Sequence, residues 1–273
     1  MLEAPYPELD DLLEMMGEAG QRLSDIDASE GAAGNISLCL RWPVELRNRF
    51  PVVETLTLPQ AVPQLAGATF LVSGSGRRLR EIIDEPAASV AGIVVDPGGQ
   101  TGRLHQAHQR RFQRVTSEFN SHVAVHDDQM CASGTNFHAL IHAQPPYLTY
   151  LSHIPRYQDE SYLNHHLLRW QPETIVQLPD GVGFIPFQLP GSAQLMAANV
   201  AALRAHRIVV WAKHGVMARS DVSVKRAADR IEYAETGARY EYLNLMAGEA
   251  GEGLSPDELR AICAAFHVNQ SVF

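Results

Sequence analysis

The chain has 273 residues, of which 45% are hydrophobic and 19% are charged. A chain of this length and composition can bury a large core, which excludes an intrinsically disordered protein. The formal net charge of −9 at pH 7 argues against a protein whose general surface binds nucleic acid or an acidic membrane.

Cysteine usage and the N-terminal residues indicate the compartment. Cys39, Cys131 and Cys263 fit neither a zinc ribbon nor a disulfide framework, so we expect three free, buried thiols, which suit a reducing cytosol. The first residues lack the basic and apolar regions of a signal peptide, and no apolar run is long enough for a membrane span. We therefore expect a soluble, cytoplasmic protein that binds neither membrane nor nucleic acid.

The first part of the chain predicts one helix and three short strands. Leucines and a methionine recur at helical spacing over residues 8–24. Residues 31–38 are a small-residue turn that enters a strand. Apolar runs at 70–72 and 92–95 predict two further strands, each followed by a glycine-containing turn.

The middle of the chain predicts a helix and a strand. Thr116 or Ser117 is a suitable N-cap for a helix that runs to about Cys131. A strand over 137–144 follows and is stopped by two prolines. The segment 151–173 is rich in His, Tyr and Arg, and its length favours a functional flap or a short helix.

The last part predicts two strands and two helices. Residues 174–178 and 208–211 are the expected strands, and 221–246 is a long helix. Ser255, followed by proline and then by an acidic residue, opens the final helix. Helices and strands intermix without a repeat or a long linker, which favours a single α/β domain over residues 1–273.

Several residues have the chemistry of a metal or phosphate site. In the strand 137–144, His142 and Gln144 lie two apart and share a face, where a His-x-His pair would clamp a metal ion. Glu118 and His122 share a face of the predicted helix, whose N-terminus favours anions. Each feature taken singly also fits a structural explanation: a capped surface helix or a core histidine. Gly74-Ser75-Gly76 fits either an anion-binding nest or a plain turn.

These motifs together resemble the class II aldolase/adducin family. They occur along nearly the whole chain and in the family's order: Gly34-Asn35, Ser73-Gly74-Ser75-Gly76, Thr116-Ser117-Glu118 with His122, the strand with His142, and Lys213-His214-Gly215. Asp84-Glu85-Pro86, Pro179-Asp180-Gly181 and Ser255-Pro256-Asp257 also resemble sugar-phosphate-cleaving members. Ordered agreement at this many places is far more specific than one motif.

The resemblance implies a fold, an assembly and a reaction. The fold is a central, largely antiparallel sheet with helices on both faces, in a homotetramer with active sites near subunit interfaces. The reaction is the reversible cleavage of a ketose 1-phosphate to dihydroxyacetone phosphate and an aldehyde. A zinc ion held by three histidines acts as the Lewis acid, and a glutamate moves the proton beside the carbonyl.

The resemblance also assigns site residues. Glu118 matches the catalytic glutamate, and Glu173 matches a second acidic residue that relays a proton to the aldehyde oxygen. His142 and His214 match two zinc ligands, and Gln144 stands at the third. The residues that match the phosphate pocket are Asn35, Ser75, Gly76, Thr116 and Ser117.

Two departures keep alternatives open. Ala32 replaces an asparagine near the substrate, and Gln144 replaces a histidine ligand. A glutamine carbonyl is a harder donor than imidazole, so zinc is held more weakly and another divalent metal such as Mn, Co or Mg becomes competitive. Glu118 or a water can fill the third position. The alternatives are an epimerase, dehydratase or decarboxylase of the same superfamily, or a metal-impaired, non-catalytic binding module.

Overall fold

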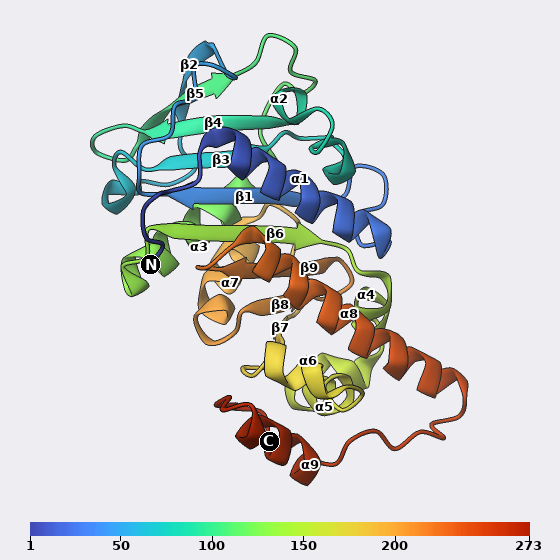
Figure 1. Cartoon of the computed structure of the whole chain (residues 1–273). Coiled ribbons are helices and arrows are strands. Elements are labelled where there is room, and N and C mark those ends of the chain that lie inside the picture. The colour runs from blue at the N-terminus through green and yellow to red at the C-terminus, as the bar shows by residue number, and fades with distance from the viewer.

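The computed structural model describes residues 1–273 and is built on one nine-stranded sheet (Figure 1). Its strands are β1 (Asn35–Leu40), β2 (Val52–Thr57), β3 (Thr69–Ser73), β4 (Val90–Val95), β5 (Thr101–Gln106), β6 (Phe137–Ala143), β7 (Gly183–Ile185), β8 (Ile208–Trp211) and β9 (Gly215–Ser220). Their order is β2-β5-β4-β3-β1-β6-β9-β8-β7, and only β7 and β8 pair in parallel.

Helices cover both faces of this sheet, which confirms the expected α/β fold. They are α1 (Leu9–Asp25), α2 (Pro86–Ser89), α3 (Phe119–Ser133), α4 (Pro146–Leu151), α5 (Glu160–Leu167), α6 (Pro172–Gln177), α7 (Ala193–Ala205), α8 (Val224–Met246) and α9 (Pro256–Ala265). Three 3₁₀ turns lie at Pro63–Leu65, Leu79–Glu81 and Pro155–Gln158. α1 and α8 pack together on one face, and α3 and α7 on the other (Figure 1). None of these helices is both long and apolar enough for a membrane span.

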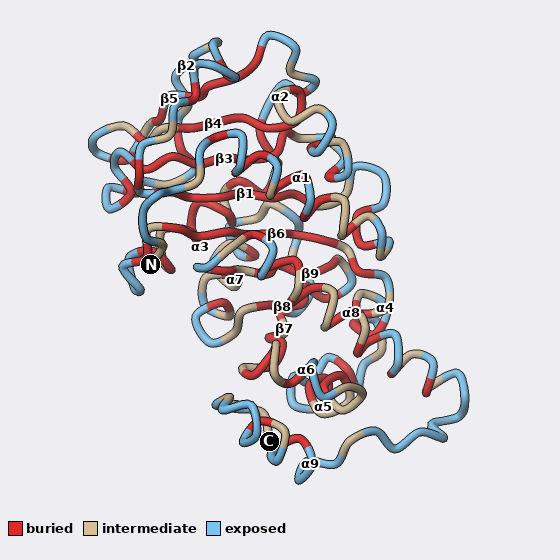
Figure 2. The backbone as a smooth tube through the Cα atoms, viewed as in Figure 1, coloured by how far each residue is buried: buried red, intermediate tan, exposed pale blue.

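The central strands are buried on both faces because helices lie above and below them. Every residue of β1, β3 and β6 is buried, whereas β2 at the sheet edge is largely exposed (Figure 2). Two-sided burial explains why these strands are more apolar than a half-exposed strand would be. It also means that any polar side chain on them must find a partner inside the protein.

Three expectations about local structure are wrong. Residues 174–178 do not form a strand: Pro172 occupies the first turn of α6, where its missing N–H costs nothing. Neither Thr116 nor Ser117 is the N-cap of α3; Glu118 is, with φ −97° and ψ 15°. Cys131 is exposed near the end of α3, although all three cysteines are free.

The segment 151–173 is ordered as a 3₁₀ turn and α5 rather than as an open flap. Buried Glu241 of α8 anchors this segment. The Glu241 carboxylate accepts hydrogen bonds from Arg169 at 2.8 Å, from Trp170 at 3.1 Å and from the Tyr157 hydroxyl. The short-helix expectation is therefore correct.

Candidate active site

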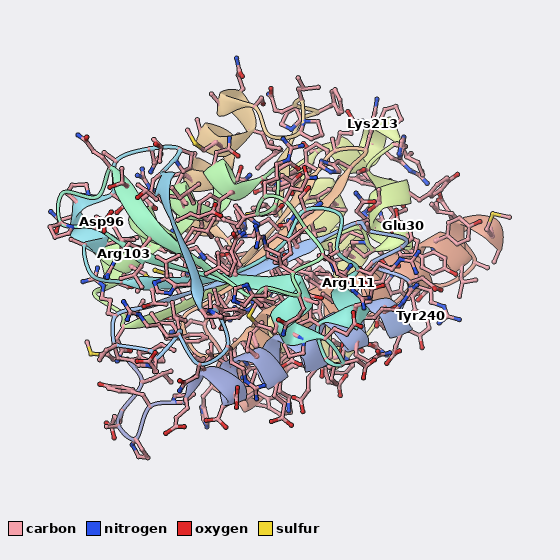
Figure 3. All side chains as sticks on the ribbon, turned by 90° about the horizontal axis from the view of Figure 1, so that it is seen from above. Glu30, Asp96, Arg103, Arg111, Lys213 and Tyr240 are labelled. Carbon is pink, nitrogen blue, oxygen red and sulfur yellow. The ribbon has the colours of Figure 1, made fainter.

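The candidate site lies where β1 begins and where β3 and β6 end. Asn35 of β1 stands directly opposite His142 of β6, so their side chains share a face of the sheet. That face is covered by α3 and α7, because the alternate residues Ile36 and Ile141 pack into the core on the α1 and α8 side. In the view from above, Lys213, the neighbour of His214 in the chain, lies at the rim of the molecule on the side away from Asp96 and Arg103 (Figure 3).

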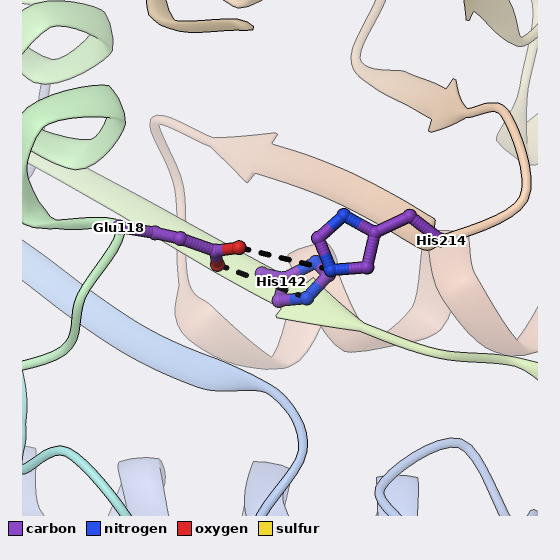
Figure 4. Close-up of side chains that lie close together, drawn as sticks. All are labelled: Glu118, His142 and His214. Carbon is purple, nitrogen blue, oxygen red and sulfur yellow. Dashed lines mark ion pairs between the residues drawn. The ribbon is translucent and has the colours of Figure 1, made fainter. Parts of the chain in front are cut away.

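Glu118, His142 and His214 converge from three separate parts of the chain (Figure 4). Glu118 Oε2 lies 3.7 Å from His142 Nε2, and Glu118 Oε1 lies 3.8 Å from His214 Nε2. The side chains are 6%, 3% and 15% exposed, respectively. Two imidazoles and a carboxylate in a nearly dry site are an unusual and costly arrangement unless they have a shared ligand or reaction.

The donor set fits a divalent metal ion. His142 Nδ1 lies 2.8 Å from the carbonyl oxygen of Val216, so it donates there and leaves Nε2 as a free lone pair. Such outer hydrogen bonds orient histidine ligands in metal sites. Ligands about 2.0 Å from a tetrahedral zinc ion are about 3.3 Å apart, and the three ligand atoms here lie within 4.8 Å of one another.

The local sequence positions both imidazoles. The His142 ring stacks on Trp211, with centroids 4.5 Å apart. Lys213 adopts a left-handed φ of 62°, and its N–H donates to Ser152 Oγ at 2.7 Å, which fixes the turn that carries His214. Gly215 follows because a Cβ there would lie 2.4 Å from the carbonyl oxygen of Ala143. The Lys-His-Gly sequence is thus a tight turn pressed against β6.

Burial and neighbouring groups set the charges in this site. Burial raises the pKa of Glu118, but the charge of His142 and the hydrogen bond from Asn35 outweigh it, so the net shift is downward. Burial lowers the pKa of His214 to about 4, with the charge of His142 acting in the same direction. At neutral pH the site therefore holds the ionised carboxylate of Glu118 beside the neutral imidazole of His214, which suits metal binding and proton transfer.

Gln144 lies beside His142. The point where a Cβ on Gly215 would stand is 3.1 Å from both Gln144 Cγ and His142 Cε1. Both side chains therefore approach Gly215. The backbone N–H of Gln144 donates to the carbonyl oxygen of Ala28 at 2.7 Å, which anchors the chain just after β6.

The two segments expected to bind phosphate lie side by side. Gly74 forms an isolated bridge with Val115, and the Ser75 N–H donates to the carbonyl oxygen of Arg114 at 2.9 Å. The Thr116 N–H donates to the carbonyl oxygen of Ser73 at 3.1 Å. These hydrogen bonds place Ser75 and Gly76 next to Thr116 and Ser117. Gly76 has the positive φ of a tight turn.

Two predicted site residues lie differently from the expectation. Asn35 is buried, and its amide is used by the protein: Nδ2 donates to Glu118 Oε2 at 2.8 Å, and Oδ1 bonds His122 Nε2. Glu173 is exposed in the first turn of α6 and forms no hydrogen bond or ion pair with Glu118, His142 or His214. A single chain thus brings together the candidate metal-ligand group, which is Glu118, His142 and His214, but not Glu173.

The sequence interpretation missed the buried polar row beneath Glu118. His122 and His126 of α3 and His138 of β6 are all completely buried, and Ser37 of β1 lies between the first two. The signal was present in the sequence: Glu118, His122 and His126 are four residues apart on one helix face.

Because these histidines are buried, we expect the free energy of unfolding to fall in acid. Burial lowers the pKa of His138 to about 3 and holds that of His126 well below 6.5. The unfolded chain binds these protons near pH 6.5, so stability is complete above that pH and falls as pH drops toward 3. Each histidine contributes about 1.4 kcal/mol per pH unit to the free energy of unfolding in this window.

Urea unfolding between about pH 7 and about pH 5 measures this slope. His138→Phe is expected to reduce it by about one proton, whereas the same change at exposed His153 leaves it unaltered. Equal slopes in the wild type and His138→Phe would contradict the assignment of a neutral buried histidine.

Comparison with known proteins agrees with this geometry. Residues 14–242 match the model of the class II aldolase and adducin N-terminal domain. The chain belongs to this family. The metal-ligand group, Asn35 and the paired turns at 73–76 and 114–117 all fall inside the matched region.

Relatives of this family member include sugar-phosphate aldolases. The chain is 28% identical to rhamnulose-1-phosphate aldolase of Bacteroides thetaiotaomicron over 244 residues, which is 88% of each protein. It is 29% identical to the Yersinia pestis enzyme of that name, over 88% of this chain and 87% of that one. The resemblance to the class II aldolase family is thereby confirmed.

Solved structures share the fold. A sugar-phosphate aldolase from Thermotoga maritima superimposes with a TM-score of 0.74 at 24% identity, over 88% of this chain and 97% of that one. An L-fuculose 1-phosphate aldolase gives a TM-score of 0.57 at 18% identity, over 97% of this chain and 100% of that one.

Proposed function

We propose that this family member is a metal-dependent aldolase that reversibly cleaves a ketose 1-phosphate to dihydroxyacetone phosphate and an aldehyde. The observation that carries the proposal is the meeting of the Glu118 carboxylate with the Nε2 atoms of His142 and His214. The similarity to rhamnulose-1-phosphate aldolases over 88% of the chain supports rhamnulose 1-phosphate as the first substrate to test.

The cofactor in this proposal is zinc or another divalent metal such as Mn or Co, held by His142 and His214 with Gln144 or Glu118 beside it. A divalent metal bound there supplies Lewis-acid polarisation of the substrate carbonyl. Ser75, Thr116 and Ser117 offer hydroxyls to the substrate phosphate. The backbone N–H groups of Gly76 and Ser117 are also free to donate, whereas those of Ser75 and Thr116 already donate to backbone carbonyls.

The protein's own groups move the protons. In cleavage the bond between C3 and C4 breaks, the C4 hydroxyl loses its proton as the aldehyde forms, and C3 gains a proton. Glu118, which is ionised in the resting site, first takes up a proton from solvent and then delivers it to C3; its carboxyl lies beside both imidazoles. We assign the proton of the C4 hydroxyl to Glu173, which passes it to solvent. Glu173 is exposed on α6, and in this proposal it reaches the site of a neighbouring subunit in a homotetramer.

The direct test is an aldol cleavage assay. The purified protein is incubated with rhamnulose 1-phosphate or fuculose 1-phosphate and with Zn, Mn or Co, and dihydroxyacetone phosphate is measured. We expect metal-dependent formation of this product with at least one substrate. Absence of the product from every combination, with metal bound to the protein, would reject the aldolase proposal. Light scattering of the same sample tests the homotetramer.

Gln144→His is expected to tighten zinc binding by about 10-fold or more, because imidazole is a better zinc donor than a neutral amide oxygen. Competition with a zinc chelator measures the dissociation constant. Gln100→His is the matched control, because Gln100 is exposed between β4 and β5, and β3 and β1 separate those strands from β6 in the sheet. If both variants bind zinc like the wild type, Gln144 does not face the metal.

A further inference from the structure

A continuous chain of hydrogen bonds leads from Glu118 into the protein core. Asn35 Nδ2 lies 2.8 Å from Glu118 Oε2, and Asn35 Oδ1 bonds His122 Nε2. Ser37 Oγ lies 2.6 Å from His122 Nδ1 and 2.7 Å from His126 Nε2. His126 Nδ1 then lies 2.8 Å from His138 Nδ1, so the chain ends on a sixth residue.

Matching periods of helix and strand make this arrangement possible. Glu118, His122 and His126 recur every four residues, about 6 Å along the helix axis. Asn35 and Ser37 are two residues apart, about 6.6 Å along β1, so each fits between successive helix side chains. His138 enters from β6, opposite Cys39, on the same face of the sheet.

The chain has one consistent direction of donation. An ionised Glu118 can only accept, so Asn35 Nδ2 donates to it and Asn35 Oδ1 must accept from His122 Nε2–H. His122 is neutral, since burial lowers its pKa to about 4, and its Nδ1 therefore accepts the Ser37 hydroxyl proton. The donor of each hydrogen bond therefore determines the donor of the next one.

The inner half follows the same rule. The single Ser37 proton is used by His122, so Ser37 Oγ accepts from His126 Nε2–H. The His126 Nδ1 lone pair then accepts from His138 Nδ1–H. The one ring atom left over is His138 Nε2, a buried lone pair without a partner. Every hydrogen bond of the chain is thus donated in the direction of Glu118.

We propose that Asn35, His122, Ser37, His126 and His138 form a positioning chain that holds Glu118 Oε2 and leaves Oε1 to exchange protons with the substrate. The proposal rests on Glu118 being the proton-transfer group of the proposed function. No proton travels along the chain, because each member keeps its own hydrogen. The buried bonds restrict the carboxylate to one orientation, which a side chain with three rotatable bonds would not otherwise keep.

Ser37 and His126 are therefore positioning residues rather than catalytic residues. Ser37→Ala is expected to lower kcat of the cleavage reaction by roughly 10- to 100-fold with little change in KM, as for other outer-sphere partners. Ser121→Ala is the matched control. Ser121 is completely buried on α3, the helix of His122 and His126, but it contacts Asn199 of α7 and no member of the positioning chain. That variant is expected to keep kcat within about 2-fold.

A pair of variants at His126 guards against a folding defect. His126→Gln retains an N–H donor toward Ser37, whereas His126→Leu removes it. We expect the glutamine variant to retain most of kcat and the leucine variant to resemble Ser37→Ala. Equal kcat in both variants, or an unchanged kcat in Ser37→Ala, would overturn the positioning role.

Imidazole ¹⁵N spectra test the chain without substrate or activity. We expect the Nε2–H tautomer for His122 and His126 and the Nδ1–H tautomer for His138, assigned by loss of signals in single variants. The opposite tautomer at His122 would overturn the chain even if the cleavage assay succeeds. The expected tautomers in a protein that cleaves no ketose phosphate would leave the chain intact and reject only the proposed reaction.

Discussion

Glu118→Gln is expected to lower kcat for cleavage by about 10³-fold, because general acid–base groups contribute roughly 10²- to 10⁴-fold. The substitution retains an acceptor oxygen for Asn35 Nδ2 and keeps the volume of the side chain, so the site stays assembled. The amide cannot take up or deliver the proton at C3. Steady-state kinetics with the best ketose 1-phosphate measures the loss.

Glu241→Gln is the control for this variant. Glu241 is also buried and accepts hydrogen bonds from Arg169 and Trp170, but it lies on α8 outside the site. We expect it to lower stability while kcat of the folded fraction stays near the wild-type value. A Glu118→Gln enzyme with wild-type kcat would show that another group moves the proton.

His142→Ala is expected to abolish metal binding, with less than about 0.1 zinc ions bound per chain, because one of two histidine ligands is lost. The change also removes the ring that stacks on Trp211. Activity is expected to fall with metal content to the background of the assay. Elemental analysis after dialysis against zinc measures the number of zinc ions bound per chain in the variant and in the wild type.

His105→Ala provides the comparison for metal content. His105 is a buried histidine of β5 whose two ring nitrogens have no partner, and it lies outside the metal-ligand group. Its zinc content is expected to equal that of the wild type. Retention of full zinc by His142→Ala would place the metal elsewhere.

Much of the fold was predictable because its strongest signals are local. The period of leucines in α1, the Ser-Pro-x-Glu start of α9 and the apolar run of β6 each fix an element without help from the rest of the chain. The segment 174–178 was misassigned because a short apolar run fits a strand or a helix equally well. Pro172 followed by Glu173 was the available helix signal.

The site was predictable only as a set of residue types. The sequence pointed to Glu118, His142 and His214, but their convergence depends on the pairing of β1 with β6 and of β6 with β9. The family resemblance assigns Asn35 to the phosphate pocket. Only the packing of α3 on β1 shows that the Asn35 amide also bonds Glu118 and His122. Long-range contacts of this kind leave no local pattern.

The most direct test is a crystal structure of the zinc-loaded protein with anomalous diffraction at the zinc edge. We predict one peak within about 2.0–2.1 Å of the Nε2 atoms of His142 and His214, with Glu118 or Gln144 beside it. A fully occupied zinc peak away from both imidazoles would contradict the account. Cleavage of ketose phosphates by a protein with no metal between His142 and His214 would also contradict the account.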